Sequence, residues 1–280
     1  MHPILIDFGR FKLYSYGLML FIAFILGIFI ASRREKRYGL PEAAALDFSV
    51  AIIISSLIGS RTLYVLTHIA EFRGRWFDVV NPFQSDGTIG IAGLVLVGGV
   101  TVAILTILAM AWLRDINLLR ILDVFAPSLA LGIAIGRIGC LLNGCCYGLP
   151  TELPWGITFP MNCPAGAHYV DIHIHPTQIY AILYNFAIFG IILFAEKGKI
   201  RFPGFSASIF FMVYGIFRFI NESLRYHESG MHLVDWNSGF ITVSQVFGIG
   251  LFLIGTIIFI VNRNASELSG NSSKKDRIES

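Results

Sequence analysis

The feature that most constrains the fold is a series of long apolar stretches separated by short polar segments. A helix needs about 20 apolar residues to cross a bilayer. Only 14% of the 280 residues are charged and 55% are hydrophobic, whereas a soluble domain carries about 25% charged residues. These values exclude a soluble domain and predict an all-α integral membrane protein. We expect about seven transmembrane helices, near residues 15–32, 45–68, 90–113, 119–142, 177–196, 204–222 and 240–262.

The distribution of positive charge between these stretches predicts their orientation. Lysine and arginine are enriched in cytoplasmic loops. With the N-terminus outside, thirteen of the 21 lie on inner segments, five on outer segments and three within the predicted spans. We therefore predict an N-out/C-in topology. No basic patch interleaved with aromatic residues indicates a nucleic-acid partner, so none is expected.

The spacing of the apolar stretches predicts one polytopic membrane domain over residues 1–264. Its longest outer loop, 143–176, contains three histidines and Trp155 but no lysine or arginine. This loop is long enough for a small extracytoplasmic cap. Residues 265–280 are polar and rich in serine, which predicts a disordered cytoplasmic tail.

Three arginines within the predicted spans indicate a functional site. Arg61, Arg137 and Arg218 lie toward the predicted outer ends of their helices, and an arginine at membrane depth is costly enough to suggest a function. Glu222 follows Arg218 by four residues, so the two share a helix face and can pair. The alternatives are that this pair only fixes helix packing and that Arg137 extends to the headgroups. Because the arginines outnumber the nearby acids, we favour a site for a lipid phosphate, which a guanidinium binds with two parallel hydrogen bonds.

Other polar residues fall in the same outer layer. His175 and Gln178 flank Pro176 and Thr177 at the start of the fifth span, and Tyr16 begins the first span. His175 is also explained as a residue at the helix start, and Tyr16 as part of an interfacial aromatic belt. Asp123, at the inner start of the fourth span, is interpreted as a cap or a local polar contact.

The four cysteines also lie in or near this layer. Cys140, Cys145 and Cys146 stand at the outer end of the fourth span, and Cys163 lies in the outer loop. An oxidising exterior allows a disulfide between Cys163 and one of the other three, whereas neighbouring cysteines pair only under strain. Inert thiols are the second interpretation, and a metal site with His173 or His175 is the third. The spacing C-x4-C-C matches no standard zinc pattern, so no metal is expected.

Taken together, these motifs resemble the prolipoprotein diacylglyceryl transferase family of bacterial membrane enzymes. The resemblance extends from Tyr16 to about Arg225, and the order and spacing of its motifs are specific. The matching segments are Tyr16-Gly17-Leu18-Met19, Gly59-Ser60-Arg61 with Tyr64-Val65-Leu66, Asp123 with Ala126-Pro127, Gly136-Arg137-Ile138-Gly139, Asn143-Gly144 with Gly148, Pro154-Trp155-Gly156, His175-Pro176-Thr177-Gln178-Ile179-Tyr180, and Tyr214-Gly215-Ile216-Phe217-Arg218-Phe219-Ile220 with Glu222.

The resemblance implies an activity and a location. A phosphatidylglycerol–prolipoprotein diacylglyceryl transferase moves a diacylglyceryl group from phosphatidylglycerol to the lipobox cysteine of a prelipoprotein. A thioether forms, glycerol 1-phosphate is released, and no cofactor is implied. The enzyme resides in the bacterial inner membrane, with its active site toward the extracytoplasmic side.

The resemblance also implies roles for individual residues. Arg137 and Arg218 clamp the phosphate, and Glu222 holds Arg218 in place. His175 and Tyr16 complete the implied catalytic set. The implied substrate-binding set is Arg61, Arg137, Asn143, Gly148 and Gln178.

The chain departs from the family pattern at three positions. Cys140 stands where the family has asparagine, Cys145 where it has glutamate, and Val97 where it has histidine before Gly98-Gly99. One interpretation is a divergent branch that runs the same reaction with another base, either His175 or a thiolate of the cysteine cluster. The other is a paralogue that binds phospholipid or modifies another acceptor and keeps a redox or structural cysteine cluster.

Overall fold

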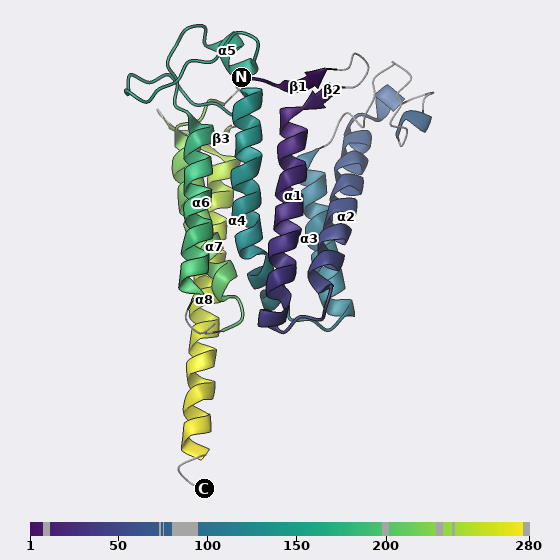
Figure 1. Cartoon of the computed structure of the whole chain (residues 1–280), viewed down its shortest axis with the longest axis vertical. Helices are drawn as coiled ribbons and strands as arrows, with labels where there is room; N and C mark the ends of the chain where they lie inside the picture. Colours follow the sequence, from purple (N-terminus) through teal and green to yellow (C-terminus); the bar gives the residue numbers. More distant parts are fainter. Residues whose placement is uncertain are drawn as a thin grey trace. The chain divides into compact units, whose positions relative to one another are not determined.

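The computed structural model describes residues 1–7, 12–72, 74, 76–79, 95–197, 202–227, 232–236 and 239–276, and helices dominate it (Figure 1). The α-helices are α1 (Ser15–Arg34), α2 (Ala44–Thr67), α3 (Leu96–Leu113), α4 (Leu118–Asn143), α5 (Pro164–His168), α6 (Thr177–Ala195), α7 (Phe205–Ser223) and α8 (Val243–Asp276). Short 3-10 helices are η1 (Glu35–Tyr38), η2 (Ile69–Phe72) and η3 (Trp76–Val79). Two antiparallel hairpins pair β1 (Ile4–Asp7) with β2 (Lys12–Tyr14) and β3 (His232–Trp236) with β4 (Gly239–Thr242).

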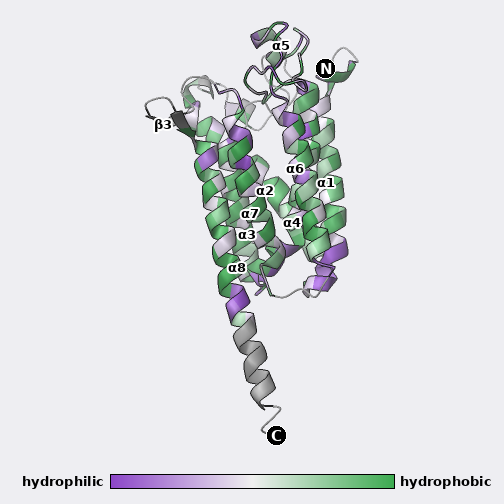
Figure 2. Cartoon of the chain, turned by 90° about the vertical axis from the view of Figure 1, so that its left-hand side faces the viewer, coloured by the Kyte–Doolittle hydropathy of each residue, from purple (hydrophilic) through white to green (hydrophobic). Residues whose placement is uncertain are grey.

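The helices confirm the predicted class of all-α membrane protein. Among the described residues, six helical segments are long and apolar enough to cross a bilayer: Ser15–Tyr38, Ala44–Thr67, Leu96–Leu113, Leu118–Asn143, Thr177–Ala195 and Val243–Ser266. Helix α7 corresponds to the sixth predicted span, but Arg218, Asn221 and Glu222 make its last turns polar. Figure 2 shows apolar residues along the helices and hydrophilic residues gathered toward helix ends. Residues 90–94 of the predicted third span lie outside the described residues.

The chain divides into two compact units, and the single membrane domain over residues 1–264 stays a prediction. The first comprises Met1–Arg34 and Leu122–Ser280, and the second comprises Glu35–Ile121. In the first unit, Ala126 and Ala130 of α4 share a helix face, because residues four apart lie above one another. This face packs in a core with residues of α6 and α7: Ala181, Tyr184, Ile188, Ile192 and Phe210.

Glycines let neighbouring helices approach closely in both units. In the first unit, a Cβ atom on Gly215 of α7 would lie 2.5 Å from the Gly248 carbonyl oxygen of α8. In the second unit, a Cβ atom on Gly59 of α2 would lie 2.5 Å from the Gly98 carbonyl oxygen of α3. Small residues at such crossings are typical of helix pairs in membranes, where close backbone packing drives association.

A buried ion pair lies near the start of α4 in the first unit. Arg34 donates two hydrogen bonds to the Glu196 carboxylate, at 2.6 and 2.5 Å. Arg34 also donates to the carbonyl oxygens of Asp123 and Val124, at 3.1 and 3.2 Å. Ser206 donates to Glu196 at 2.5 Å. We call Arg34, Asp123, Glu196 and Ser206 the anchor cluster.

Asp123 completes the anchor cluster by holding the start of α7. Its carboxylate accepts the backbone N–H groups of Gly204 and Ala207, at 2.6 and 2.9 Å. The first backbone N–H groups of a helix have no partner within the helix and need such acceptors. This contact confirms the interpretation of Asp123 as a cap, with the difference that it caps α7 rather than its own helix.

The loop from α4 to α6 forms a small ordered cap, which Figure 1 shows at the end of α4 and α6 with α5 within it. Its buried core consists of Phe159, Cys163, Ala165 and Ile174. Isolated β-bridges pair Pro150 and Ile157 with Ile174. The side of the membrane on which this cap lies stays a prediction.

Helix α8 differs from the predicted disordered tail. The helix continues past residue 265 to Asp276, and residues 277–280 lie outside the described residues. Helix formation is costly to nucleate and cheap to extend. A membrane span that is already helical therefore propagates into the polar residues that follow it.

Candidate active site

Arg137 lies in the last two turns of α4 and is half-buried. Its electrostatic neighbours are the thiols of Cys140 and Cys146 and the hydroxyls of Tyr184 and Tyr214. Among the residues that the structure describes, no carboxylate pairs with Arg137 and no acceptor makes a hydrogen bond with its guanidinium. A partly buried cation in this state favours an anionic ligand.

Arg218 of α7, in contrast, is paired as its spacing predicts. Its guanidinium lies 2.7 Å from the Glu222 carboxylate and donates to the Ser244 hydroxyl at 2.9 Å. The same carboxylate lies 3.6 Å from the Arg225 guanidinium and 3.5 Å from the His227 ring. Glu222 is thus shared by two arginines and a histidine, which leaves this corner with excess positive charge.

Tyr184 and Cys146 show that Arg137, Arg218 and Arg225 lie around one region of the first unit. Both Arg137 and Arg218 act electrostatically on the Tyr184 hydroxyl, and both Arg137 and Arg225 act on the Cys146 thiol. Glu222 is the one carboxylate that pairs with any of these arginines in the described part of the chain. The region therefore carries a net positive charge suited to a phosphate.

Sequence reasoning missed Arg225 and Tyr184. Arg225 is one of the outer-segment charges, and its position three residues after Glu222, just past the end of α7, was the available signal. Tyr184 lies among apolar residues of α6, and a hydroxyl in the middle of a span was the available signal. Arg137, Arg218 and Glu222 were named in advance, and the structure brings them into one unit.

Tyr16 approaches the same region from α1. A Cβ atom on Gly139 would lie 3.1 Å from the Tyr16 ring and 3.2 Å from its Cα atom, so α1 and α4 touch here. Arg137 and the three clustered cysteines act electrostatically on the Tyr16 hydroxyl. The structure thus places Tyr16 within electrostatic reach of Arg137, and its role in the site stays a prediction.

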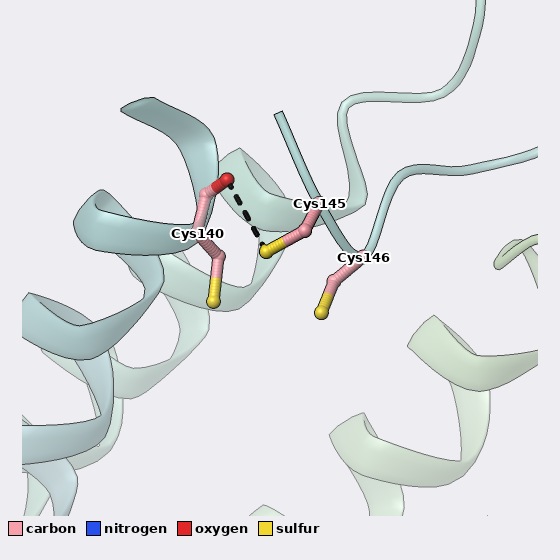
Figure 3. Close-up of side chains that lie close together, drawn as sticks. All are labelled: Cys140, Cys145 and Cys146. Atoms are coloured by element: carbon pink, nitrogen blue, oxygen red, sulfur yellow. Dashed lines mark hydrogen bonds between the residues drawn. The ribbon is translucent and has the colours of Figure 1, made fainter. Parts of the chain in front are cut away.

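Three cysteines gather at the end of α4 (Figure 3). The sulfur atoms of Cys140, Cys145 and Cys146 all lie within 4.8 Å of one another. Cys140 projects from α4, and Cys145 and Cys146 project from the loop that follows it (Figure 3). The Cys145 thiol also lies 3.8 Å from the Cys140 carbonyl oxygen. We call these three residues the cysteine cluster.

The helix end explains why the cysteine cluster forms. Gly144 has φ +70°, the left-handed conformation that commonly ends a helix. The Cys145 N–H then donates to the Cys140 carbonyl at 3.1 Å, and the Gly144 N–H donates to the Leu141 carbonyl at 3.2 Å. This pair of bonds defines a Schellman motif, which brings the side chains at its two ends together. In this chain those side chains are Cys140 and Cys145.

Cys146 turns back toward the other two. Its φ is +61°, which is uncommon for any residue other than glycine. Hydrogen bonds with Cys140 and Cys145 lower the pKa of the Cys146 thiol, and the charges of Arg225 and Arg137 lower it further.

The predicted disulfide of Cys163 is not formed. All four cysteines are free thiols, and the Cys163 thiol donates to the Pro160 carbonyl at 3.1 Å. Cys163 is buried in the cap core next to Gly144, where a Cβ atom on that glycine would lie 2.5 Å from its sulfur. Cys163 is not among the three cysteines whose sulfur atoms gather within 4.8 Å of one another.

The start of α6 fixes the loop that carries Cys145 and Cys146. Gln178 donates to the Cys145 carbonyl at 2.8 Å, and Thr177 donates to the Cys146 carbonyl at 2.8 Å. Both side chains are buried. Asn143, the last residue of α4, interacts through its side chain with Cys145. Gln178 and Asn143, predicted to bind substrate, thus contact the cysteine loop in this structure.

Gly148 and His175 lie on adjacent backbone segments of the cap. The Gly148 N–H donates to the His175 carbonyl at 3.1 Å, and a Cβ atom on Gly148 would lie 2.5 Å from that oxygen. The His175 ring bonds to the Tyr180 hydroxyl at 3.2 Å, and that hydroxyl also accepts from Trp155 at 2.8 Å. The His175 side chain thus contacts the first turn of α6.

Arg61 and Val97 belong to the second unit and are described there alone. Arg61 donates to the Val79 carbonyl at 2.9 Å. Its guanidinium stacks over the rings of Tyr64 and Phe72, with 5.7 and 5.2 Å to their centres. Val97 lies in the first turn of α3 and is 67% exposed. The convergence of Arg61 with Arg137 and Arg218 stays a prediction.

Comparison with known proteins identifies the family of this chain. The sequence profile of the prolipoprotein diacylglyceryl transferase family matches residues 3–261. The phosphatidylglycerol–prolipoprotein diacylglyceryl transferase of Clostridium tetani is 29% identical over 94% of this chain and 98% of its own length. The corresponding protein of Finegoldia magna is 30% identical over 88% of this chain and 89% of its length. Transferase 2 of Clostridium perfringens is 30% identical over 94% and 96%. The chain therefore belongs to the prolipoprotein diacylglyceryl transferase family of membrane enzymes.

Proposed function

We propose that this protein transfers the diacylglyceryl group of phosphatidylglycerol to the lipobox cysteine thiol of prelipoproteins. The observation that carries this proposal is the half-buried Arg137, which has no anionic partner among the described residues and lies beside the excess positive charge around Glu222. The names of the C. tetani and F. magna relatives point to the same reaction.

Arg137 and Arg218 hold the phosphate of the lipid in this proposal. Each guanidinium presents a planar fork of donors that suits phosphate oxygens. When the bond between the glyceryl carbon and the phosphate oxygen breaks, the leaving glycerol 1-phosphate gains a negative charge. Fixed cations stabilise such developing charge strongly where water is excluded. Glu222 fixes the direction of the Arg218 guanidinium through their 2.7 Å contact.

Tyr16 and the cap hold the second substrate. Tyr16 projects from α1 toward Arg137, where its hydroxyl meets the reacting centre. The loop on which the signal peptide rests is shaped by Gln178, Asn143 and Gly148. His175, at the end of the cap, is one of the two candidate bases. The N-out/C-in distribution of lysine and arginine supports an extracytoplasmic position for this end of α4, in the inner membrane of a bacterium.

The test uses purified full-length protein in detergent, phosphatidylglycerol and a lipobox peptide with one cysteine. We expect mass spectrometry to find the diacylglyceryl mass on that cysteine, and glycerol 1-phosphate in the solution. Arg137→Ala removes the product. Arg120→Ala is the matched control, because Arg120 is an exposed arginine at the opposite end of the same helix. Lipid binding without any product would refute the proposal and favour a paralogue with another acceptor.

A further inference from the structure

The cysteine cluster lies beside the proposed phosphate site, and the proposed reaction gives it no role. Its three thiols are side chains of a type that binds metal ions. Its sulfur atoms lie within 4.8 Å of one another. A zinc ion with bonds of about 2.3 Å to sulfur needs sulfur atoms roughly 3.8 Å apart in a tetrahedron. The 4.8 Å limit exceeds this spacing by about 1 Å, and changes in the χ1 angles of the cysteines can bring the sulfur atoms closer. We propose that Cys140, Cys145 and Cys146 bind a zinc ion whose fourth coordination position takes the cysteine thiol of the substrate.

The backbone holds the three ligands in place before any metal arrives. The Schellman motif fixes Cys140 against Cys145, and the left-handed Cys146 directs the third sulfur to the same point. A non-glycine residue in that conformation is strained, and such strain concentrates at functional sites. In a zinc ribbon, closely spaced cysteine pairs supply the ligands. Here a helix end and the left-handed turn after it supply them, which explains the unusual spacing C-x4-C-C.

Groups around the ligands suit a metal site. Gln178 and Thr177 bind the carbonyl oxygens of Cys145 and Cys146, at 2.8 Å each, from buried positions on α6. Outer contacts of this kind orient metal ligands and raise affinity. Three thiolates and one Zn²⁺ carry a net charge of about −1. Arg137 and Arg225, which both act on Cys146, lie where they offset that charge.

The proposal rests on the proposed function, because the reaction there needs a thiolate. A free thiol has a pKa of about 8.5, and the thiolate is the nucleophile. The nearby acid–base groups are engaged elsewhere. Glu222 is shared by Arg218, Arg225 and His227, and the His175 ring bonds to Tyr180. A bound metal deprotonates a coordinating thiol directly, which supplies the activation that these groups do not.

The reaction then balances in three steps. The substrate thiol binds at the fourth position of the zinc and releases its proton to water. A lone pair of the bound sulfur attacks the glyceryl carbon, forming the carbon–sulfur bond as the carbon–oxygen bond to the phosphate breaks. The electron pair of that bond leaves with glycerol 1-phosphate, which departs as a dianion held by Arg137 and Arg218, and the neutral thioether dissociates from the metal.

The first experiment measures metal content in full-length protein purified in detergent without chelators. We expect about one zinc per chain by inductively coupled plasma mass spectrometry. Cys140→Ser, Cys145→Ser and Cys146→Ser each lower it severalfold, while Cys163→Ser leaves it unchanged as the matched control. Metal-free protein that also takes up no zinc on dialysis, or a disulfide within the cluster, would overturn the proposal.

The second experiment tests the open coordination position and does not depend on catalysis. Cobalt(II) replaces zinc, and its visible spectrum reports the ligands. We expect sulfur-to-cobalt charge-transfer bands, and a shift of the visible bands when a lipobox peptide with one cysteine is added. The matching serine peptide produces no shift. A cobalt spectrum that the cysteine peptide does not change would overturn the role in thiol activation.

The two proposals fail in different ways. Transfer of the diacylglyceryl group by protein that binds neither zinc nor cobalt would refute the zinc site and leave the proposed function standing. A metal site that responds to the cysteine peptide, in protein that yields no diacylglyceryl product, would keep the site and refute the proposed reaction.

Discussion

The two ends of α4 carry two polar clusters that differ in how their charges are matched. At the start, Arg34 pairs with Glu196 through two hydrogen bonds and also binds two backbone carbonyls, and Asp123 holds two N–H groups of α7. At the other end, Arg137 pairs with no acid among the described residues, and Glu222 is shared by Arg218 and Arg225. Burial of charge is common to both ends, so burial does not identify a site. The site is identified instead by an arginine that has no acidic partner among the described residues, namely Arg137.

The difference between the two ends of α4 predicts that substitutions at one end lower stability and that substitutions at the other end lower activity. A matched buried pair loses its compensation when one partner is removed, so its substitution destabilises the fold. An arginine whose partner is a ligand leaves no uncompensated acid behind when it is removed. We therefore expect variants of the anchor cluster to unfold more easily and variants near Arg137 to stay folded and inactive.

The largest effect is expected for Glu196→Ala, which leaves Arg34 buried without its carboxylate. Breaking a buried pair costs about 3–5 kcal/mol, so the free energy of unfolding should fall by that amount. Reversible denaturation in mixed detergent micelles measures it. Glu152→Ala, at an exposed position in the cap, is the control. An unchanged free energy of unfolding would show that the anchor cluster is not what holds this end of the bundle.

Arg137→Ala should have the next largest effect, and on activity rather than stability. Loss of one group that stabilises developing charge lowers the rate by about 10²–10³-fold. The transferase assay measures it, and unfolding in micelles should match the unsubstituted protein. Arg137→Lys keeps the charge but loses the planar fork, so we expect partial activity. If Arg137→Ala lowered the free energy of unfolding as well as the transferase rate, the two ends of α4 would not differ in the way described above.

Gly144→Ala tests the link between the helix end and the cysteine cluster. The left-handed conformation costs about 1–2 kcal/mol for a residue with a Cβ atom, and that atom would also meet the Cys163 sulfur. We expect the free energy of unfolding to fall by about that amount. Gly132→Ala on the same helix is the control, because its Cβ atom would meet nothing within 4 Å and alanine favours a helix. Equal effects of the two substitutions would argue against the Schellman motif.

The smallest effect is expected for Asp123→Ala, which removes the cap of α7. Loss of an N-terminal cap costs about 0.5–2 kcal/mol, and micelle denaturation measures this difference. Asp123→Asn should lose part of the stability, because its amide offers one acceptor oxygen whereas both carboxylate oxygens of Asp123 accept an N–H. Activity per folded molecule should stay constant in both variants. A selective loss of activity would assign Asp123 a role that its contacts do not suggest.

Much of the candidate site followed from local spacing in the sequence. Glu222 lies four residues after Arg218 on one helix, so their pairing needed no tertiary information. Arg137 stood out because an arginine at the end of an apolar span is costly. Arg225 and Tyr184 were missed, because their proximity to Arg137 depends on how α6 and α7 pack against α4.

The cysteines show the limit of sequence reasoning most clearly. Of the three interpretations of the cysteines, the structure holds them as free thiols, with Cys163 in the cap core and the other three in the cluster. Cys140 and Cys145 meet because of a helix-ending turn, and the glycine that permits this turn was visible in the sequence. The direction of the Cys146 side chain could not be predicted from the sequence, because its left-handed conformation depends on the contact of its carbonyl oxygen with Thr177.

The sequence by itself determined the helical membrane class, most of the spans and the residues whose charge needs an explanation. Apolar length and composition are properties of a continuous stretch, so they can be read without a fold. Only the tertiary structure decided which charges are matched. Arg34 was counted among the inner positive charges, and its partner Glu196 lies 162 residues away. Packing of α1, α4, α6 and α7 brings that pair together and leaves Arg137 available for a ligand.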